Sequence, residues 1–181
     1  MRKVNILLIF LIIICALVTV FSEFDRGIVI VLKDLSILLT LTLPYILNKI
    51  FKLNISDYLI FIWILFIFSA HYLGVILELY NKWYMFDKIT HFMSGILSAG
   101  AGVMILKKVD SRKKLFNILF ILSFTWLCAG LWEVFEFTCN YFFGGDAQKV
   151  IETGVSDTMW DMIVAFFGSI IVSLIYFYKK R

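Results

Sequence analysis

The chain has 181 residues, of which 62% are hydrophobic and 18% aromatic, and it contains a single proline. Its mean hydropathy of +0.95 is higher than a water-soluble domain of this size needs, and apolar runs long enough to cross about 30 Å of hydrocarbon recur along nearly its whole length. The formal net charge of +4 comes largely from short connections between these runs, so it does not indicate nucleic-acid binding. These features predict an all-α, polytopic membrane protein surrounded by lipid.

Six apolar segments follow one another, and we expect each to form one transmembrane helix of a single membrane domain, residues 1–181. The predicted spans are 4–21, 28–50, 57–79, 89–106, 115–143 and 157–178. The first resembles a signal peptide in its basic start and apolar core, but we expect it to stay as an uncleaved anchor. The fourth is rich in Gly, Ala and Ser, which let a neighbouring helix approach closely.

The basic residues predict the orientation of these spans. Of the 17 Lys and Arg residues, 12 lie in the N-terminus, the second and fourth connections and the C-terminus, whereas the alternate connections hold single residues such as Arg26 and Lys149. Because cytoplasmic segments carry the excess of Lys and Arg, both termini are expected in the cytoplasm. The three cysteines lie within apolar runs and are expected to be small buried residues, not a disulfide framework.

Two carboxylates, Glu133 and Glu136, lie one helical turn apart inside the fifth predicted span. A charged side chain deep in a bilayer costs about 2.5 kcal/mol or more, so such a pair marks a functional site. The alternative is that both lie at the water interface and only solvate the helix end. The largely apolar residues 139–143, which follow them, argue against this alternative. We therefore predict both as catalytic residues.

Other ionisable residues are expected at a similar depth. Counting about 1.5 Å per helical residue from the cytoplasmic boundary places four of them about 21 to 28 Å away: His71, His91, Glu133 and Asp161. Three spacings are compatible with shared helical faces: Asp87 with His91, Asp157 with Asp161, and His71 with Glu78. The pattern predicts one polar layer in the outer half of the membrane.

In this layer several acids face few bases, and like charges in a low-dielectric interior need protons or a cation. A divalent metal is the simplest such cation, and carboxylate with imidazole favours Mn²⁺, Fe²⁺, Zn²⁺ or Mg²⁺. The predicted ligands are His91, Asp87, Glu136, Asp157 and Asp161, with His71 and Glu78 as secondary candidates. Two other interpretations stay open: Asp157 as a helix cap, and His91 as a hydrogen-bond partner of Asp87 alone.

Three motifs carry a resemblance to a known family. They are Asp-x-x-x-His at 87–91, Glu-x-x-Glu at 133–136 and Asp-x-x-x-Asp at 157–161, in this order. With their flanking residues they resemble the YjdF-like family of small bacterial inner-membrane proteins, over about residues 57 to 175. The resemblance implies a multi-pass protein of the bacterial inner membrane. That family is a domain of unknown function, so it implies no reaction.

Three functions are compatible with these features. The first is a metal-dependent hydrolase or transferase that acts on a lipid or envelope substrate near the outer face. The second is a small transporter or a proton- or cation-coupled carrier, although the charges gather in one half of the membrane and leave no polar path to the cytoplasm. The third is a non-catalytic lipid-binding protein, in which neutralising the acids would change stability only.

Overall fold

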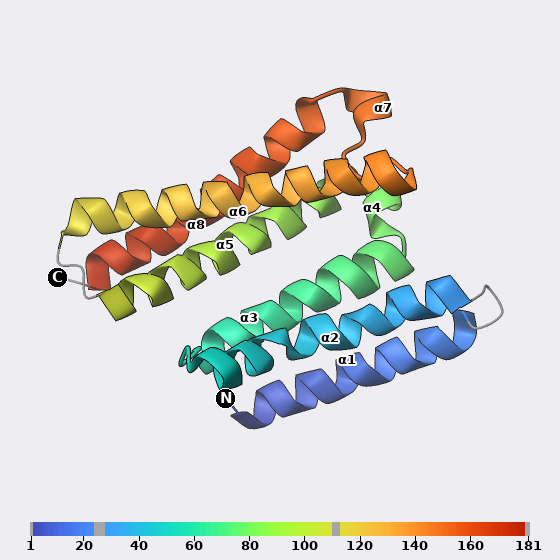
Figure 1. Cartoon of the computed structure of the whole chain (residues 1–181), viewed down its shortest axis with the longest axis horizontal. Helices are drawn as coiled ribbons and strands as arrows, with labels where there is room; N and C mark the ends of the chain where they lie inside the picture. Colours follow the sequence, from blue (N-terminus) through green and yellow to red (C-terminus); the bar gives the residue numbers. More distant parts are fainter. Residues whose placement is uncertain (1, 24–27, 110–112, 180–181) are drawn as a thin grey trace. The chain divides into compact units, whose positions relative to one another are not determined.

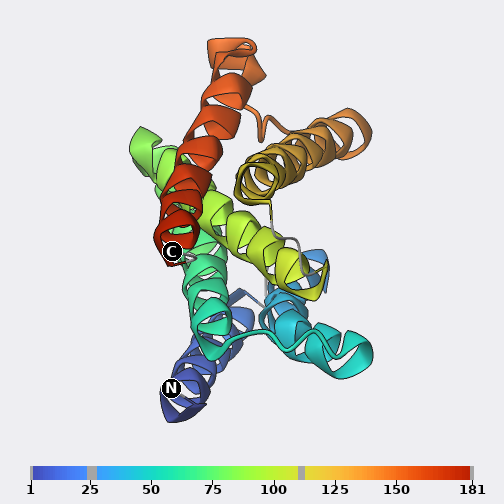
Figure 2. The ribbon, with the colours of Figure 1, turned by 90° about the vertical axis from the view of Figure 1, so that its left-hand side faces the viewer.

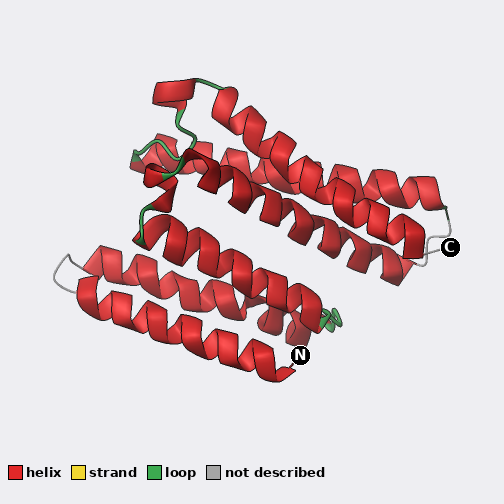
Figure 3. Cartoon of the chain, turned by 180° about the vertical axis from the view of Figure 1, so that it is seen from behind, coloured by secondary structure: helices red, strands yellow, loops and turns green. Residues whose placement is uncertain are grey.

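The structure, a computed structural model, describes residues 2–23, 28–109 and 113–179, and its regular elements there are all helical (Figures 1 and 3). The elements are α1 (Arg2–Glu23), α2 (Ile28–Phe51), α3 (Asp57–Ile67), the π-helix η2 (Phe68–Ile76), α4 (Leu79–Lys82), α5 (Tyr84–Val109), α6 (Lys114–Phe143), α7 (Val150–Thr153) and α8 (Ser156–Lys179). The all-α prediction is confirmed. Each predicted span corresponds to one long helical stretch.

Four helical stretches of the described residues are long and apolar enough to cross a membrane. They are Asp57–Ile76, Tyr84–Val109, Lys114–Phe143 and Ser156–Tyr178. The N-terminal helices contribute the shorter apolar stretches Asn5–Phe21 and Ile37–Phe51. The chain is thus a helical membrane protein, while six spans with cytoplasmic termini stay a prediction. Arg26 and the middle of the basic connection, residues 110–112, lie outside the described residues.

The helices form two compact units, which we call unit 1 (Met1–Phe86) and unit 2 (Asp87–Arg181). The single membrane domain expected from the sequence stays a prediction. In unit 1, helices α1, α2 and α3 lie side by side (Figure 1). Aliphatic side chains from all three helices form its core: Ile12, Ala16, Ile37, Leu41, Ile60 and Ile64.

A hydrogen bond between two helices of unit 1 compensates for the only proline. Pro44 lies inside α2 and has no N–H, so the carbonyl of Thr40 lacks the donor that residue i+4 normally provides. The indole Nε1 of Trp63, on α3, donates to this carbonyl at 2.8 Å. Since an unsatisfied carbonyl is expensive in an apolar environment, this bond ties α3 to α2 at the proline.

This pairing predicts a specific coupling between Trp63 and Pro44. Trp63→Phe removes the donor and is expected to lower the free energy of unfolding by about 1–3 kcal/mol. Pro44→Ala restores a backbone N–H for Thr40, so the same Trp63 substitution is expected to cost less in that background. Unfolding of the four proteins in detergent measures the coupling, and equal costs in both backgrounds would refute the compensation.

In unit 2, helices α5, α6 and α8 pack together through residues that are buried at intervals of four (Figure 2 shows them from a perpendicular direction). The buried positions on α6 are Asn117, Ile121, Thr125, Ala129 and Glu133. On α8 they include Asp157, Asp161, Ala165, Ser169 and Ser173, and on α5 Asp87, His91, Gly95 and Ala99. Such i, i+4 rows are the ridges by which helices interdigitate. These rows place polar residues of the three helices at similar heights along the unit, in layers.

The register of these layers follows from contacts between the antiparallel helices α6 and α8. Near one end, Asn117 Nδ2 donates to the Tyr176 hydroxyl at 2.9 Å. Further along, the rings of Trp126 and Phe166 meet edge to face at 5.5 Å. Each step up α6 thus matches an equal step down α8. By this register Glu133 lies at the level of Asp161. This level belongs to the end of unit 2 where α5 and α8 begin, which we call the charged end.

Directly beyond the charged end, α5 and α8 touch through their backbones. A Cβ atom added at Gly95 would lie 1.9 Å from the carbonyl oxygen of Ala165, and one added at Gly168 would lie 2.5 Å from that of Phe92. Only glycine permits this approach. The small-residue pattern of the fourth predicted span therefore acts in helix packing, as expected.

We predict that Gly95→Ala separates α5 from α8 and lowers the free energy of unfolding by about 1–3 kcal/mol, because a backbone atom cannot yield as a side chain can. Gly130→Ala is the matched control, since the nearest atom to its Cβ would be Met162 Cε at 3.5 Å, an ordinary contact. Thermal unfolding in detergent measures both. Equal stability of the two variants would contradict the close crossing.

Candidate ion-binding site

The charged end of unit 2 is built where two helices begin. Asp87, Lys88 and His91 lie in the first two turns of α5, and Asp157 and Asp161 lie in the first two turns of α8. All five are buried. The positive ends of the helix dipoles favour carboxylates at these positions. The sequence places acids where the backbone itself helps to stabilise them.

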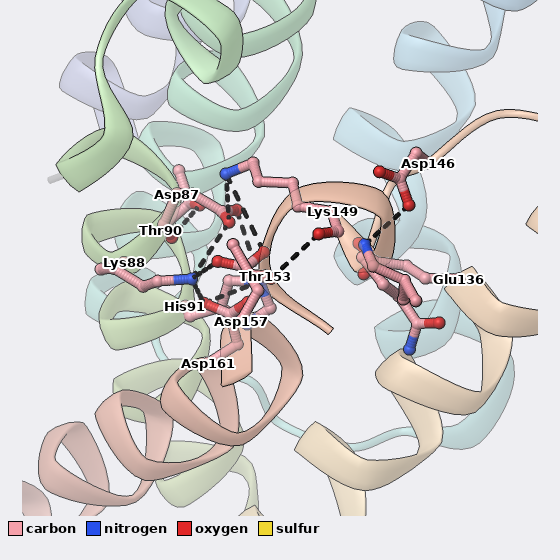
Figure 4. Close-up of polar contacts among 12 residues, drawn as sticks. Asp87, Lys88, Thr90, His91, Glu136, Asp146, Lys149, Thr153, Asp157 and Asp161 are labelled. Carbon is pink, nitrogen blue, oxygen red and sulfur yellow. Dashed lines mark hydrogen bonds and ion pairs between the residues drawn. The ribbon is translucent and has the colours of Figure 1, made fainter. Parts of the chain in front are cut away.

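The ammonium group of Lys88 lies at the centre of this cluster (Figure 4). Its Nζ atom is 2.5 Å from Asp157 Oδ1 and 2.6 Å from Asp161 Oδ1. A third carboxylate oxygen, Asp87 Oδ2, lies 3.4 Å away. An ammonium has three N–H donors, so three aspartates from two helices surround one cation. This arrangement joins α5 to α8.

A second ammonium reaches the cluster from the connection between α6 and α8. Lys149 Nζ lies 3.0 Å from Asp87 Oδ2 and 3.9 Å from Asp157 Oδ2 (Figure 4). The backbone of Lys149 has φ = 51°, in the left-handed region that a lysine rarely adopts. This conformation turns the chain just before α7. Its side chain then points to the aspartates.

These lysines correct the charge argument made from the sequence. Three aspartates and two ammonium groups leave one net negative charge among these five residues, so a metal is not required to balance them. Lys88 is not among the predicted site residues because the predicted fourth span begins at residue 89, whereas α5 begins at Tyr84. The spacing of Asp87 and His91 on one helical face already required an earlier start. The sequence also contains a feature that could have indicated Lys149, since it is the only Lys or Arg between Lys114 and Lys179.

His91 completes a group that can hold a metal ion. Its Nε2 atom lies 3.6 Å from Asp87 Oδ1 and 3.8 Å from Asp161 Oδ1, and one ligand atom from each of the three residues lies within 4.8 Å of the others. The two distances from His91 exceed those of a hydrogen bond, and the three ligand atoms are close enough together to share one ion. The structure thus brings together three of the predicted metal ligands. Asp157 lies beside them and contacts both lysines.

The two glutamates of α6 have separate partners. Glu133 is buried, and Gln148 Nε2 donates to its backbone oxygen at 3.1 Å and to its Oε2 at 3.3 Å. Its Oε1 atom is buried without a hydrogen-bond partner. Glu136 is only partly buried, accepts from Trp132 Nε1 at 2.8 Å, and lies apart from the cluster in Figure 4. Glu133 is therefore the better placed of the two predicted catalytic residues.

The secondary candidates lie in unit 1. His71 is in η2, and this π-helix ends at Ile76. Glu78 follows with φ = 59° and forms an exposed ion pair with Lys82 at 3.4 Å. The prediction that His71 and Glu78 share one helical face is wrong, because the helix stops between them.

We predict that Lys88→Met lowers the free energy of unfolding by about 3–5 kcal/mol, because it leaves buried carboxylates without their cation. Lys82→Met is the matched control, since its ion pair with Glu78 is exposed and is expected to contribute little. Adding Asp157→Asn to Lys88→Met should recover part of the loss. Unfolding in detergent measures all three, and equal stability of the two lysine variants would contradict the role of Lys88.

Comparison with known proteins gives a family and no closer relative. Nothing among the curated proteins or the solved structures matches this chain. A family model described as "Predicted membrane protein (DUF2238)" matches residues 4–181. This match is consistent with the YjdF-like resemblance, although it does not carry that name. Because the match covers nearly the whole sequence and the fold is helical and apolar throughout, the chain belongs to this family of membrane proteins.

Proposed function

We propose that this protein is a metal-dependent membrane enzyme that holds a divalent ion between Asp87, His91 and Asp161. The observation that carries the proposal is the convergence of one ligand atom from each residue within 4.8 Å, on two helices of one unit. A histidine and two carboxylates suit Mn²⁺, Fe²⁺ or Zn²⁺, and Mg²⁺ with water completing its shell. Three protein ligands leave coordination positions for water or substrate.

The charge of the cluster is compatible with a bound ion. A divalent cation would change the net charge of Asp87, Asp157, Asp161 and the two lysines from one negative to one positive. The ammonium of Lys88 shares Asp87 and Asp161 with the proposed ion, so it must give up part of these contacts when the ion binds. Asp157 remains as its partner at the same depth. The lysine thus serves as a built-in cation for the metal-free protein.

The chemistry we propose is hydrolysis or group transfer on a lipid or envelope substrate. A metal in this position would polarise a substrate oxygen or activate water. Glu133 supports this role, since its Oε1 atom is buried without a hydrogen-bond partner at the level of Asp161. We assign Glu133 as the general base, with Glu136 as a secondary catalytic candidate. The bacterial inner membrane and six spans with cytoplasmic ends are part of the same proposal.

One observation favours an enzyme over a carrier. Directly beyond the charged layers, α5 and α8 are in backbone contact at Gly95 and Gly168. A carrier must expose its site to both sides of the membrane in turn, and this contact opposes access from the far end of unit 2. An enzyme needs access from one side only. Flux of protons or metal ions in proteoliposomes would overturn this preference.

Metal binding by the purified protein tests the proposal, and the chain contains a natural control. It has two histidines, so His91→Ala and His71→Ala each remove one. We expect Mn²⁺, followed by its electron paramagnetic resonance signal, to bind at about one ion per chain. His91→Ala and Asp161→Asn should weaken binding about tenfold or more, and His71→Ala should leave it unchanged. Absence of binding, or equal loss in both histidine variants, would refute the site.

A further inference from the structure

The connection between α6 and α8 has the features of a substrate-binding segment. We call residues 144–154 the strap. Glycines with positive φ lie at both ends: Gly144 and Gly145 at 77° and 110°, and Gly154 at 62°. Between them, Asp146 accepts from the backbone N–H groups of Val150 and Ile151 and so orders the start of α7. The strap is an ordered segment bounded by glycines at which the chain turns.

Two adjacent residues of the strap reach into unit 2. Gln148 is buried against Glu133, and Lys149 contacts Asp87 and Asp157. Within the cluster, the side chain of Lys149 is the most exposed, at 22%, whereas those of Lys88 and Asp157 are 6% and 0% exposed. The Lys149 side chain is therefore the part of the cluster most open to an approaching molecule.

On the outer side of the strap, α7 presents apolar side chains. Ile151 is 86% exposed and Val150 is 49% exposed, and both lie in the connection between two candidate spans, α6 and α8. In a membrane protein such a position is at the level of the lipid headgroups and upper acyl chains. The strap thus has an ammonium on its inner side and aliphatic side chains on its outer side.

We propose that the strap binds a phosphate-bearing amphiphile, with the phosphate at Lys149 and the apolar tail against α7. This assignment of the substrate class rests on the proposed function, because the cluster without a metal carries a net negative charge that opposes an anion. With a divalent ion bound, the net charge becomes positive. A metal and an ammonium on the same side of a site are a common combination for phosphate.

The assignment also explains the strained backbone of Lys149. The left-handed region is unfavourable for a lysine, and Lys88 already supplies the buried cation that joins the helices. The conformation points Gln148 and Lys149 into the unit while α7 stays exposed. Lys149 contributes to the charge balance of the aspartates, but unlike Lys88 it does so from the accessible edge of the cluster.

Phosphorus NMR of the full-length, Mn²⁺-loaded protein in detergent tests this inference. Bound Mn²⁺ broadens the signal of a nearby phosphate, so the broadening reports binding next to the metal. The probes are dihexanoyl phosphatidic acid and inorganic phosphate, with dihexanoylglycerol as a phosphate-free competitor. The variants are Lys149→Gln, Lys149→Arg and the control Lys82→Gln, and each is checked for Mn²⁺ binding and thermal unfolding.

We expect dihexanoyl phosphatidic acid to bind more tightly than inorganic phosphate. Lys149→Gln should weaken its binding about tenfold or more with Mn²⁺ binding retained, whereas Lys149→Arg and Lys82→Gln should keep it. If Mn²⁺ does not bind the parent protein, the proposed function fails. If Mn²⁺ binds but Lys149→Gln has no effect on the lipid probe, the inference fails alone. Equal binding of inorganic phosphate, or equal competition by dihexanoylglycerol, would also overturn the assigned substrate class.

Discussion

Unit 2 depends on the ion pairs that the ammonium group of Lys88 forms. The ammonium holds Asp157 and Asp161 at 2.5 and 2.6 Å, so one cation from α5 fixes the start of α8. In an apolar environment a buried ion pair is weak evidence for net stability, because desolvation opposes the Coulomb attraction. Its contribution is to specificity: another register of α5 and α8 would separate the buried carboxylates of α8 from Lys88. The ion pairs of Lys88 therefore favour the observed register.

The glycine contact at Gly95 and Gly168 complements this ion pair. Charges alone would allow α5 and α8 to diverge beyond the cluster, whereas backbone contact keeps them together and excludes side-chain volume from the crossing. The two features act over adjacent turns of the same helices. Their combination leaves the charged groups accessible mainly from the end where α5 and α8 begin, which is also where the strap lies.

Much of this arrangement was predictable from the sequence, for physical reasons. Apolar length predicted every long helix, because a span needs about 20 apolar residues and short connections leave few alternatives. Helical spacing and depth brought Asp87, His91 and Asp161 together correctly. The partner of Glu133 was not predictable, since Gln148 comes from a connection whose path depends on the left-handed conformation of Lys149. Lys88 was assigned to a loop because a cation at a helix start usually indicates the membrane boundary.

The two lysines differ in a way that bears on function. Lys88 is deep in the cluster and is explained by the packing of α5 against α8. Lys149 adds a second cation at the accessible edge, at the cost of a strained backbone, and the aspartates it contacts already have Lys88 beside them. Strain at an accessible charged group is typical of sites that bind ligands. Lys88 alone would leave two net negative charges among the three aspartates, so Lys149 also contributes to the charge balance of the cluster. Its place at the accessible edge is the feature that agrees with the anionic substrate we propose beside a metal.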